Sequence, residues 1–407
     1  MSKRYDAVIG GGGPTGLAMA LALAHVFGGD ARIAVVDPAP ESQAMGNDPR
    51  AWALAAASVH MLRSLDVWSD VAPHAQPVTA IEITDSGLEA GIRPVLLSYD
   101  NQTDAGEPAA HIVPNQVLLD ALRARVEAYG RQVITPMRGR SIAGFEAATG
   151  GVTATLDDGT ECTTDLLIAA DGRNSQLREA AGIKSLRWAY DQVGIVTTVT
   201  HQRAHGAKAV QHFLPGGPFA ILPLPGSRSC ITWSEDAAVA RTIMAMDDAA
   251  FLAELQQRFG GKLGLLELAG GRASFPLGMQ LARTFIAPGF ALIGDAAHTV
   301  HPIAGQGLNL ALRDIAALAE CIADGTRAGL ACGDGTVLER YQAWRRFDAT
   351  LSAGAFDAIN RLFSNDVTLL RSAREVGLGL VDRSTALKRF FVHEAAGLSG
   401  DVPRLMR

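Results

Sequence analysis

The chain has 407 residues, 48% of them hydrophobic, and a formal net charge of −6 at pH 7. This length allows two or three domains and a sizeable buried core. The acidic balance argues against a nucleic-acid-binding protein, which usually presents a basic face.

Cysteine and hydropathy patterns exclude further classes. The four cysteines form no Cys-x-x-Cys pair and are not interleaved with histidine, so neither a zinc site nor a disulfide framework is indicated. The N-terminus lacks the pattern of a signal peptide, and no apolar stretch reaches spanning length without a charge. We therefore expect a cytoplasmic protein that is at most peripheral to the inner face of a membrane.

The chain begins with a β-α-β pattern. Residues 5–9 predict a buried strand, residues 14–27 a helix, and residues 33–36 a second strand that ends at Asp37. Between the first strand and the helix lies Gly11-Gly12-Gly13-Pro14-Thr15-Gly16, which fits the GxGxxG pattern of dinucleotide-binding folds.

Each part of this pattern has a physical role toward a dinucleotide. Gly11 permits the tight turn, Gly13 lets the backbone approach a pyrophosphate, and Gly16 lets helix and strand pack closely. The helix N-terminus presents N–H groups and the positive end of its dipole to the phosphates. Asp37, about 21 residues after Gly16, is placed to accept hydrogen bonds from a ribose.

A second acidic motif follows in the middle of the chain. The elements predicted before it are helices over 50–65 and 114–129, a strand over 80–84 and a hairpin over 152–162. The apolar run 166–170 predicts a parallel strand that returns to the first sheet, and Asp171-Gly172 follows it directly. Asp171 has two readings here: a residue beside a bound pyrophosphate, or the cap of a helix that starts near Ser175.

The later part of the chain changes character twice. From Tyr190 to Glu235, β-branched and polar residues alternate between Gly/Pro turns, which predicts an antiparallel sheet in a second domain. Residues 290–293 then predict another strand of the first sheet, residues 308–323 an apolar helix, and everything after Gly335 helical structure.

The turn before that apolar helix carries the third motif. Asp295 ends a strand and is placed to accept from the ribityl hydroxyls of FAD, and Gly305-Gln306-Gly307 opens the helix. A helix N-terminus there would stabilise the negative charge of a reduced flavin. Asp295, His298 and His301 also have a spacing that a metal can use, but no further acidic or cysteine ligand is near, so we expect no metal.

In this order and spacing, the three glycine-marked segments point to an FAD enzyme rather than to a simple NAD dehydrogenase. The run from His301 through Gly305, Gly307 and Asn309 to Asp314 resembles the para-hydroxybenzoate hydroxylase type of flavin monooxygenase, and more narrowly the ubiquinone-biosynthesis hydroxylases. The resemblance covers nearly the whole chain. Its supporting residues are Tyr190-Asp191-Gln192, the run 213–218, Leu222-Pro223-Leu224, Tyr341, Arg345 and Arg346.

The resemblance implies a role for each matching residue. The flavin-ring environment, where the chemistry occurs, would be formed by Pro302, Gly305, Gln306 and Gly307. The Asp171-Gly172 motif would serve both FAD and transient NAD(P)H. The residues implied to contact FAD are Gly11, Gly13, Gly16, Asp37, Arg50, Asn115, Asp171, Gly172, Asp295, Gly305, Gly307, Leu308 and Asn309.

The implied reaction is hydroxylation of an aromatic ring. NAD(P)H would reduce FAD, O₂ would add at the flavin C4a, and the hydroperoxide would pass one oxygen to a polyprenyl phenol of ubiquinone biosynthesis. The apolar and basic run 387–392 would contact a membrane surface or another ubiquinone-biosynthesis protein, or pack as an ordinary helix. The residues implied to line the substrate are Tyr190, Gln192, Phe213, Phe219 and Leu222.

The expected fold is α/β with three parts. A Rossmann-like FAD-binding domain would comprise the discontinuous segments 1–75, 105–185 and 275–330. An antiparallel-sheet substrate domain would comprise 76–104 and 186–274, followed by a helical C-terminal region over 331–407.

Other functions remain open at this point. A soluble aromatic acid as substrate would need a buried Arg or Tyr pair on the face of the second sheet, and between Tyr190 and Trp233 the sequence offers only Arg203 and Arg228, both beside turns. A flavin-dependent halogenase would need an active-site lysine motif that the chain lacks. A non-catalytic FAD-binding scaffold of a biosynthetic complex is the alternative of another class, and the intact segment from Gly305 to Asn309 argues against it.

Overall fold

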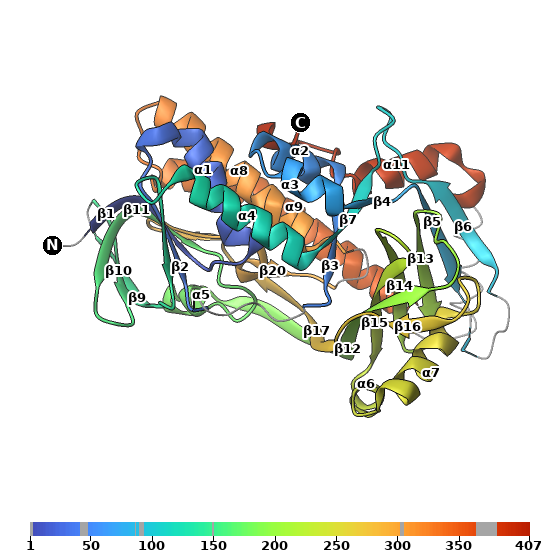
Figure 1. Ribbon diagram of the computed structural model, residues 1–407. Coiled ribbons are helices and arrows are strands. Elements are labelled where there is room, and N and C mark those ends of the chain that lie inside the picture. The colour runs from blue at the N-terminus through green and yellow to red at the C-terminus, as the bar shows by residue number, and fades with distance from the viewer. Residues whose placement is uncertain are drawn as a thin grey trace.

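A parallel sheet assembled from segments far apart in the chain forms one end of the molecule (Figure 1). The computed structural model describes residues 3–40, 48–85, 87–88, 93–148, 150–301, 305–363 and 381–407. The sheet has the order β19-β11-β1-β2-β8, with β18 antiparallel at its edge. Its strands are β1 (Lys3–Gly10), β2 (Ile33–Asp37), β8 (Ile134–Arg138), β11 (Glu161–Ala169), β18 (Ile286–Ala287) and β19 (Phe290–Leu292).

Helices cover one face of this sheet and a hairpin covers the other. Helix α1 has every residue from Gly16 to Ala24 buried, because it packs between the sheet, α4 and α8. On the other side, the hairpin predicted over 152–162 is confirmed as the antiparallel pair of β10 and the start of β11, and β9, which was not predicted, pairs with β10. Phe145 of β9 stacks on Phe290 at 5.0 Å between ring centroids. The elements are α1 (Pro14–Phe27), η1 (Gly28–Asp30), α4 (Asn115–Tyr129), β9 (Ile142–Ala148), β10 (Gly151–Leu156), α8 (Gly307–Arg327) and α9 (Gly335–Phe363).

A second, nine-stranded sheet forms the other end of the molecule (Figure 1). Its order is β20-β17-β12-β15-β14-β13-β5-β6, with β16 beside β12, and the predicted antiparallel pairing of 190–235 is confirmed. Helices α6 and α7 cover one face. The elements are β5 (Ala80–Asp85), β6 (Val95–Asp100), β12 (Ser185–His201), β13 (Lys208–Leu214), β14 (Gly217–Leu224), β15 (Arg228–Asp236), α6 (Ala237–Met244), α7 (Asp248–Phe259), β16 (Leu266–Leu268), β17 (Ala273–Ala282) and β20 (His298–Thr299).

These two sheets confirm the expected α/β class, whereas the division into three parts stays a prediction. Strand β17, which spans the boundary proposed at residue 275, pairs with β12 as far as Ala282. No helix among the described residues is long and apolar enough to cross a membrane.

The helix predicted over 50–65 is wrong in its first part. Residues 51–55 form β3, which pairs with β7 in a small third sheet, and the helix α2 begins only at Ala56. The Ala-rich sequence favours a helix locally, but the backbone of Ala53 and Ala55 bonds the side chain of Asn309, so distant partners outweigh local propensity. The elements are β3 (Ala51–Ala55), α2 (Ala56–Ser64), α3 (Trp68–Val71), η2 (Ala72–His74), β4 (Gln76–Pro77) and β7 (Ala110–Pro114).

The C-terminal region is only partly helical. Helix α9 is followed, beyond residues outside the described ranges, by α11 (Thr385–Ala395) and η5 (Arg404–Met406). Residues 396–403 are not helical, which corrects the expectation of helix throughout. The break follows from Gly397, which has φ +72° and leaves the helical conformation directly after α11.

A buried charge network joins α8, α9 and the turn after β19. Asp314 on α8 is fully buried, and its Oδ2 accepts from the Gly294 N–H at 3.0 Å and from His298 Nε2 at 2.6 Å. Its Oδ1 accepts from Nε of the equally buried Arg345 on α9 at 2.8 Å. Burial alone would raise the pKa of Asp314, but His298 and Arg345 outweigh it and hold the pKa below 3.8.

Replacing Asp314 tests this network. Asp314→Asn removes the fully buried counter-charge of the Arg345 guanidinium and leaves it only the partly exposed carboxylate of Asp348, 2.7 Å away, so the free energy of unfolding should fall by about 3 kcal/mol. Asp401→Asn is the control, because Asp401 is largely exposed and lies 3.8 Å from Arg407; it should cost about 0.5 kcal/mol or less. Both are measured by urea unfolding.

The stability difference between wild type and Asp314→Asn should depend on pH. Because the folded pKa of Asp314 lies below 3.8, its stabilisation is complete at higher pH and is lost as the pH falls through the folded pKa. The stability difference between wild type and Asp314→Asn should therefore shrink below about pH 4. A difference that stays constant into acid would contradict the ionised pair.

Candidate functional site

Four parallel strands end at one edge of the first sheet, and the predicted site residues follow them. The Gly11–Gly16 turn follows β1, Asp37 ends β2, Asp171 follows β11, and Asp295 follows β19. Backbone bonds tie the strand ends together: Ala170 N–H donates to Gly10 and Ile293 N–H to Ala169. Residues about 280 positions apart thus meet in the place where open α/β sheets bind ligands.

The glycine turn is tight on one side and open on the other. A Cβ on Gly11, which has φ +120°, would lie 2.3 Å from the Ala170 carbonyl oxygen, and one on Gly16 would lie 1.8 Å from that of Gly11. A Cβ on Gly13 would meet nothing within 4 Å. Gly13 is also the N-cap of α1, which no side chain caps. The turn therefore offers both space and a helix N-terminus to a phosphate.

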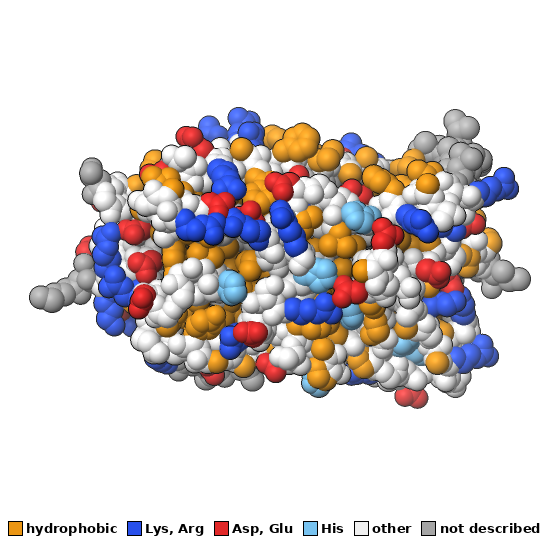
Figure 2. All heavy atoms as spheres, turned by 90° about the horizontal axis from the view of Figure 1, so that it is seen from above, with side chains coloured by type: hydrophobic (Ala, Val, Ile, Leu, Met, Phe, Trp, Pro, Cys, Tyr) orange, Lys and Arg blue, Asp and Glu red, His pale blue; other side chains and the backbone are white. Residues whose placement is uncertain are grey.

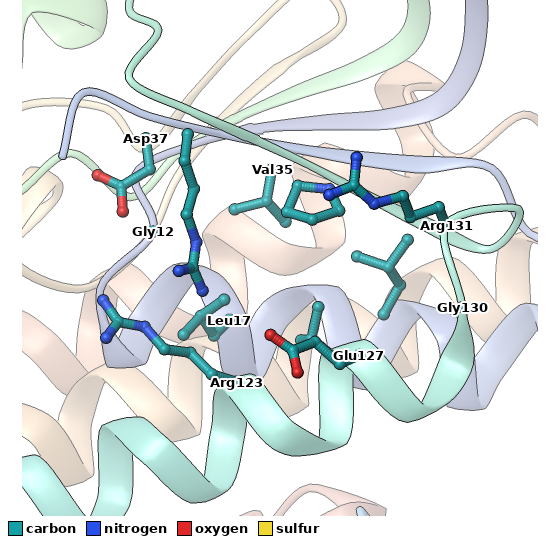
Figure 3. A pocket seen from close by; sticks show the side chains of 12 residues that line it. Gly12, Leu17, Val35, Asp37, Arg123, Glu127, Gly130 and Arg131 are labelled. Carbon is teal, nitrogen blue, oxygen red and sulfur yellow. The ribbon is translucent and has the colours of Figure 1, made fainter. Parts of the chain in front are cut away.

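A cavity of about 560 Å³ lies beside Asp37, between α1, α4, β2 and β8 (Figure 3). In the close-up, Arg123 and Glu127 project from α4 on the side that faces Asp37. The charged and apolar side chains that line this cavity suit the ribose and the ring of an adenosine group. Arg123 and Glu127 of α4 were not identified from the sequence. The lining residues are Gly12, Leu17, Val35, Asp37, Arg123, Val126, Glu127, Gly130, Arg131, Ile134, Pro136 and Arg138.

The two carboxylate oxygens of Asp171 correspond to the two roles considered from the sequence, support of a helix start and contact with a bound pyrophosphate. Its Oδ2 accepts the Leu177 N–H at 3.1 Å, which supports α5 (Gln176–Ala180), while Ser175 is the actual N-cap of that helix. Its Oδ1 is buried and has no hydrogen-bond partner in the described part of the chain. A buried carboxylate oxygen without a partner is costly, so it fits a site completed by a ligand. Gly172, with φ +81°, turns the chain beside it.

Asp295 lies in η3 (Gly294–Ala296), between the starts of two helices. A Cβ on Gly294 would lie 3.0 Å from the Thr15 side chain on α1 and 3.1 Å from Ala311 on α8. The Asp295 carboxylate is accessible to solvent yet surrounded by protein atoms, and this burial raises its pKa despite nearby His298 and arginines. A solvent-accessible carboxylate beside the start of α1 fits a hydroxyl-bearing ligand.

The start of α8 presents backbone rather than side chains. Gln306 is its N-cap, no side chain caps it, and Gly305 has φ +62°. Leu308 is buried in the core, and both ends of the Asn309 amide bond protein groups around β3 and α2. The predicted contacts at Gly305, Gly307, Leu308 and Asn309 are therefore available through backbone groups. Pro302 lies outside the described residues.

Arg50 and Asn115 converge on Asp48, a residue that sequence reasoning did not weigh. Arg50 pairs with the Asp48 carboxylate at 2.6 Å, and Asn115 Nδ2 donates to the same group at 2.7 Å. The Asn115 oxygen accepts from Trp52 Nε1 at 2.7 Å. Burial would raise the pKa of Asp48, but the bonds from Arg50 and Asn115 hold it below its usual value.

The predicted substrate residues do not share one surface. Phe219 is fully buried under α6 and α7, where it packs near Trp233. Leu222, on the other face of β14, packs in the cluster that includes Ala51 and Ala53 of β3. Phe213 faces the same side as Leu222, because neighbouring residues alternate across a strand and Leu214 faces α6 and α7. Tyr190 and Gln192 contact α9.

No cluster of His, Cys, Asp and Glu that would hold a metal ion occurs among the described residues. His298 is instead a partner of Asp314. His301 is buried, and neither ring nitrogen has a partner within the described ranges.

Two glycine variants test the site as a dinucleotide cradle. Gly16→Ala places a Cβ against the Gly11 backbone, so the free energy of unfolding should fall by about 1–3 kcal/mol. Gly13→Ala meets no atom and should cost about 1 kcal/mol or less, yet it should weaken FAD binding about tenfold, since the methyl group occupies the pyrophosphate's approach. Urea unfolding of the apoprotein and fluorescence titration with FAD measure the two effects. Equal FAD affinity of Gly13→Ala and wild type would contradict this placement.

Comparisons with known proteins agree with this geometry. The family model described as "FAD binding domain" matches residues 4–350. Ubiquinone hydroxylase UbiL of Rhodospirillum rubrum is 40% identical, over 100% of this chain and 93% of the relative. The 3-demethoxyubiquinol 3-hydroxylase of Escherichia coli is 34% identical, over 97% and 98% of the two chains. Human ubiquinone biosynthesis monooxygenase COQ6 is 31% identical, over 94% and 91%.

Solved structures share the fold. The p-nitrophenol 4-monooxygenase PnpA of Pseudomonas putida superposes with a TM-score of 0.80, covering 97% of this chain and 99% of that chain at 17% identity. PqsL of Pseudomonas aeruginosa gives 0.76, covering 92% and 99% at 22% identity. The likeness to these structures concerns the fold alone. On the family match and the full-length identities, the chain belongs to the FAD-binding family of flavin-dependent monooxygenases that includes the ubiquinone hydroxylases.

Proposed function

We propose that this FAD-dependent monooxygenase hydroxylates the aromatic ring of a polyprenyl phenol in ubiquinone biosynthesis, with NAD(P)H as electron donor and O₂ as co-substrate. The observation that carries the proposal is the convergence of the Gly11–Gly16 turn, Asp171, Asp295 and the start of α8 at one sheet edge. Full-length relatives named as ubiquinone hydroxylases support the substrate class.

The residues at this edge fit the parts of an FAD molecule. The start of α1 and Gly13 would hold the pyrophosphate, and Asp37 the adenosine ribose. Asp295 would accept from the ribityl hydroxyls. When bound, FAD supplies the electron transfer and the activation of O₂. The uncapped start of α8 would stabilise negative charge on the pyrimidine edge of the ring.

A neutral substrate suits the second sheet better than an aromatic acid. Arg203 donates to the Lys262 carbonyl and Arg228 to the Pro225 carbonyl, both at the end of β12 far from Tyr190. Lys208, the remaining cation of this region, pairs with Glu82. On the face of β14 toward β3, small and apolar residues such as Ala220 and Leu222 favour an aromatic substrate with an apolar side chain. Phe219 lies on the opposite face of β14 and does not belong to this surface.

Quinone profiling tests the proposal in cells. Cells that lack the protein should accumulate a prenylated phenol missing one hydroxyl group while ubiquinone falls, and the wild-type gene should restore the normal profile. Mass spectrometry of the accumulated compound identifies the ring position. Unchanged quinones would favour a soluble aromatic substrate. Purified protein whose NAD(P)H oxidation no phenol stimulates would favour the non-catalytic scaffold.

We further propose that α11 contacts a membrane surface, from which a polyprenyl substrate is reached. Leu387, Phe390 and Phe391 are 42%, 57% and 47% exposed on this helix. Arg389 is exposed beside them, whereas Lys388 pairs with Asp382. Figure 1 places α11 at the right-hand end of the molecule, and in the view of Figure 2 hydrophobic side chains are scattered over the whole face, including the part toward that end. Exposed aromatic groups beside a cation are typical of interfacial helices.

A double variant tests this contact. Phe390→Ser with Phe391→Ser should reduce binding to vesicles of mixed neutral and anionic lipids about tenfold, because it removes two large apolar groups. Leu265→Ser is the matched control: Leu265 is 66% exposed but lies beyond α7, away from α11. Co-sedimentation measures both. Equal binding of the double variant and wild type would exclude α11 as the membrane contact.

A further inference from the structure

A row of three paired residues crosses the middle of the second sheet. Gln211 of β13 pairs with Ala220 of β14, and Ala220 pairs with Thr232 of β15. Directly paired residues of antiparallel strands present their side chains on the same face. Gln211, Ala220 and Thr232 therefore form one short row, in which an amide and a hydroxyl stand on either side of a methyl group.

This row lies on the face of the sheet that meets β3. Ala209 and Cys230 each stand two positions before an end of the row, so they point to the same side of the sheet. Both pack in a cluster that includes Ala53 of β3. A Cβ on Gly305, two residues before α8, would lie 3.2 Å from the Ala53 Cβ, and Asn309 Nδ2 donates to the Ala53 carbonyl at 2.8 Å. The row thus faces the segment that we assign to the pyrimidine edge of FAD.

Gln211 carries a hydrogen-bond donor that the protein leaves unused. Its Nε2 is buried and has no partner among the described residues. The residue paired with it on β5 is Ile83, whose side chain offers no acceptor. A side-chain amide has two N–H donors, and a buried donor without an acceptor costs free energy. An oxygen atom of a bound molecule would satisfy this donor.

Ala220 leaves room between Gln211 and Thr232. Neighbouring strands lie about 4.8 Å apart, so the two outer residues of the row stand about 10 Å from each other. The methyl group of Ala220 fills little of this width. Although the row faces β3, each of its three residues keeps partial exposure. The terminal torsion of a glutamine is soft, so the amide can turn its N–H groups toward this space, which suits a flat ring that lies over Ala220.

Apolar side chains continue from the row along β14. Leu222 lies two residues beyond Ala220 on the same face, about 7 Å further along the strand. Leu222 packs against the same cluster, to which Leu224 belongs. An apolar chain next to the phenol oxygen would extend along these leucines while the oxygen stays at Gln211. A ring that is held at two neighbouring substituents cannot turn in its own plane, so the two contacts together fix which carbon faces the flavin.

We propose that Gln211 donates a hydrogen bond to the phenol oxygen of the substrate and so selects the ring carbon that is hydroxylated. The inference rests on the proposed function and adds the residue that sets its regiochemistry. The ring lies over Ala220, its oxygen meets Nε2 of Gln211, and its ortho chain follows Leu222. Gln211 touches the substrate but makes and breaks no covalent bond. A neutral amide binds an oxygen that is not ionised, which suits a neutral phenol.

The product distribution tests this role in the FAD-loaded enzyme, with a phenol that carries one ortho isoprene unit as test compound. Wild type should give one predominant hydroxylated isomer. Gln211→Met keeps the length of the side chain but removes its donor, so the ratio of that isomer to the others should fall about tenfold, the effect of one hydrogen bond. Gln257→Met is the matched control, because Gln257 is exposed on α7, which covers the opposite face of the sheet; it should keep the wild-type ratio.

Binding and stability measurements need no turnover. Flavin fluorescence titration should show that wild type binds the phenol about tenfold more tightly than the analogue with a methyl group in place of the hydroxyl. Gln211→Met should bind the two compounds equally. In urea unfolding, Gln211→Met should be at least as stable as wild type, because it removes a buried donor that has no partner within the described ranges.

The outcomes distinguish the role of Gln211 from the proposed function. An unchanged isomer ratio in Gln211→Met, or equal affinity of wild type for the two compounds, would overturn the role of Gln211 and leave the hydroxylase intact. A loss of stability in Gln211→Met would do the same, since it would mean that Nε2 is bonded within the protein. A wild-type enzyme that neither binds nor hydroxylates the phenol would overturn the proposed function and this inference together.

Discussion

The buried carboxylate of Asp314 is the contact on which the site geometry depends. Its two oxygens hold the Gly294 N–H, His298 and Arg345, and so fix the turn after β19 to both α8 and α9. Gly294 in turn fits between α1 and α8 with no room for a side chain. Removing one partner of such a group leaves an uncompensated buried charge, so the carboxylate ties helix starts from distant parts of the chain into one arrangement.

Helices and strands that are determined by neighbouring residues could be predicted from the sequence. The first β-α-β unit, the hairpin formed by β10 and the start of β11, and the alternating strands of the second sheet agree with the structure because periodicity and turn chemistry are properties of neighbouring residues. Strand β3 did not follow, since its partners β7 and Asn309 lie far along the chain. Residues 51–55 favour a helix locally but form a strand, because β7 and Asn309 make hydrogen bonds with their backbone groups.

The residues of the candidate site also fall into some that could be predicted from the sequence and some that could not. Gly11, Asp171 and Asp295 could be placed together because parallel strands present their carboxyl ends at one edge. Asp48 was not predicted, since it binds the side chain of Asn115, 67 residues away, as well as its near neighbour Arg50. From the sequence we expected Phe219 and Leu222 to line one substrate surface, but they lie on opposite faces of β14, which strand alternation could separate only once the core under α6 and α7 was known.

Helix α9 connects the two sheets of the molecule. Arg345 anchors it to Asp314 beside the carboxyl edge of the first sheet, and Asp357, 12 residues or about 18 Å further along the helix, accepts a hydrogen bond from Tyr190 of the second sheet. The first anchor is a fully buried ion pair, whereas the second consists of single polar contacts open to solvent on one side. The buried pair thus sets the position of the helix, and through the helix it helps to set the position of the two sheets relative to each other.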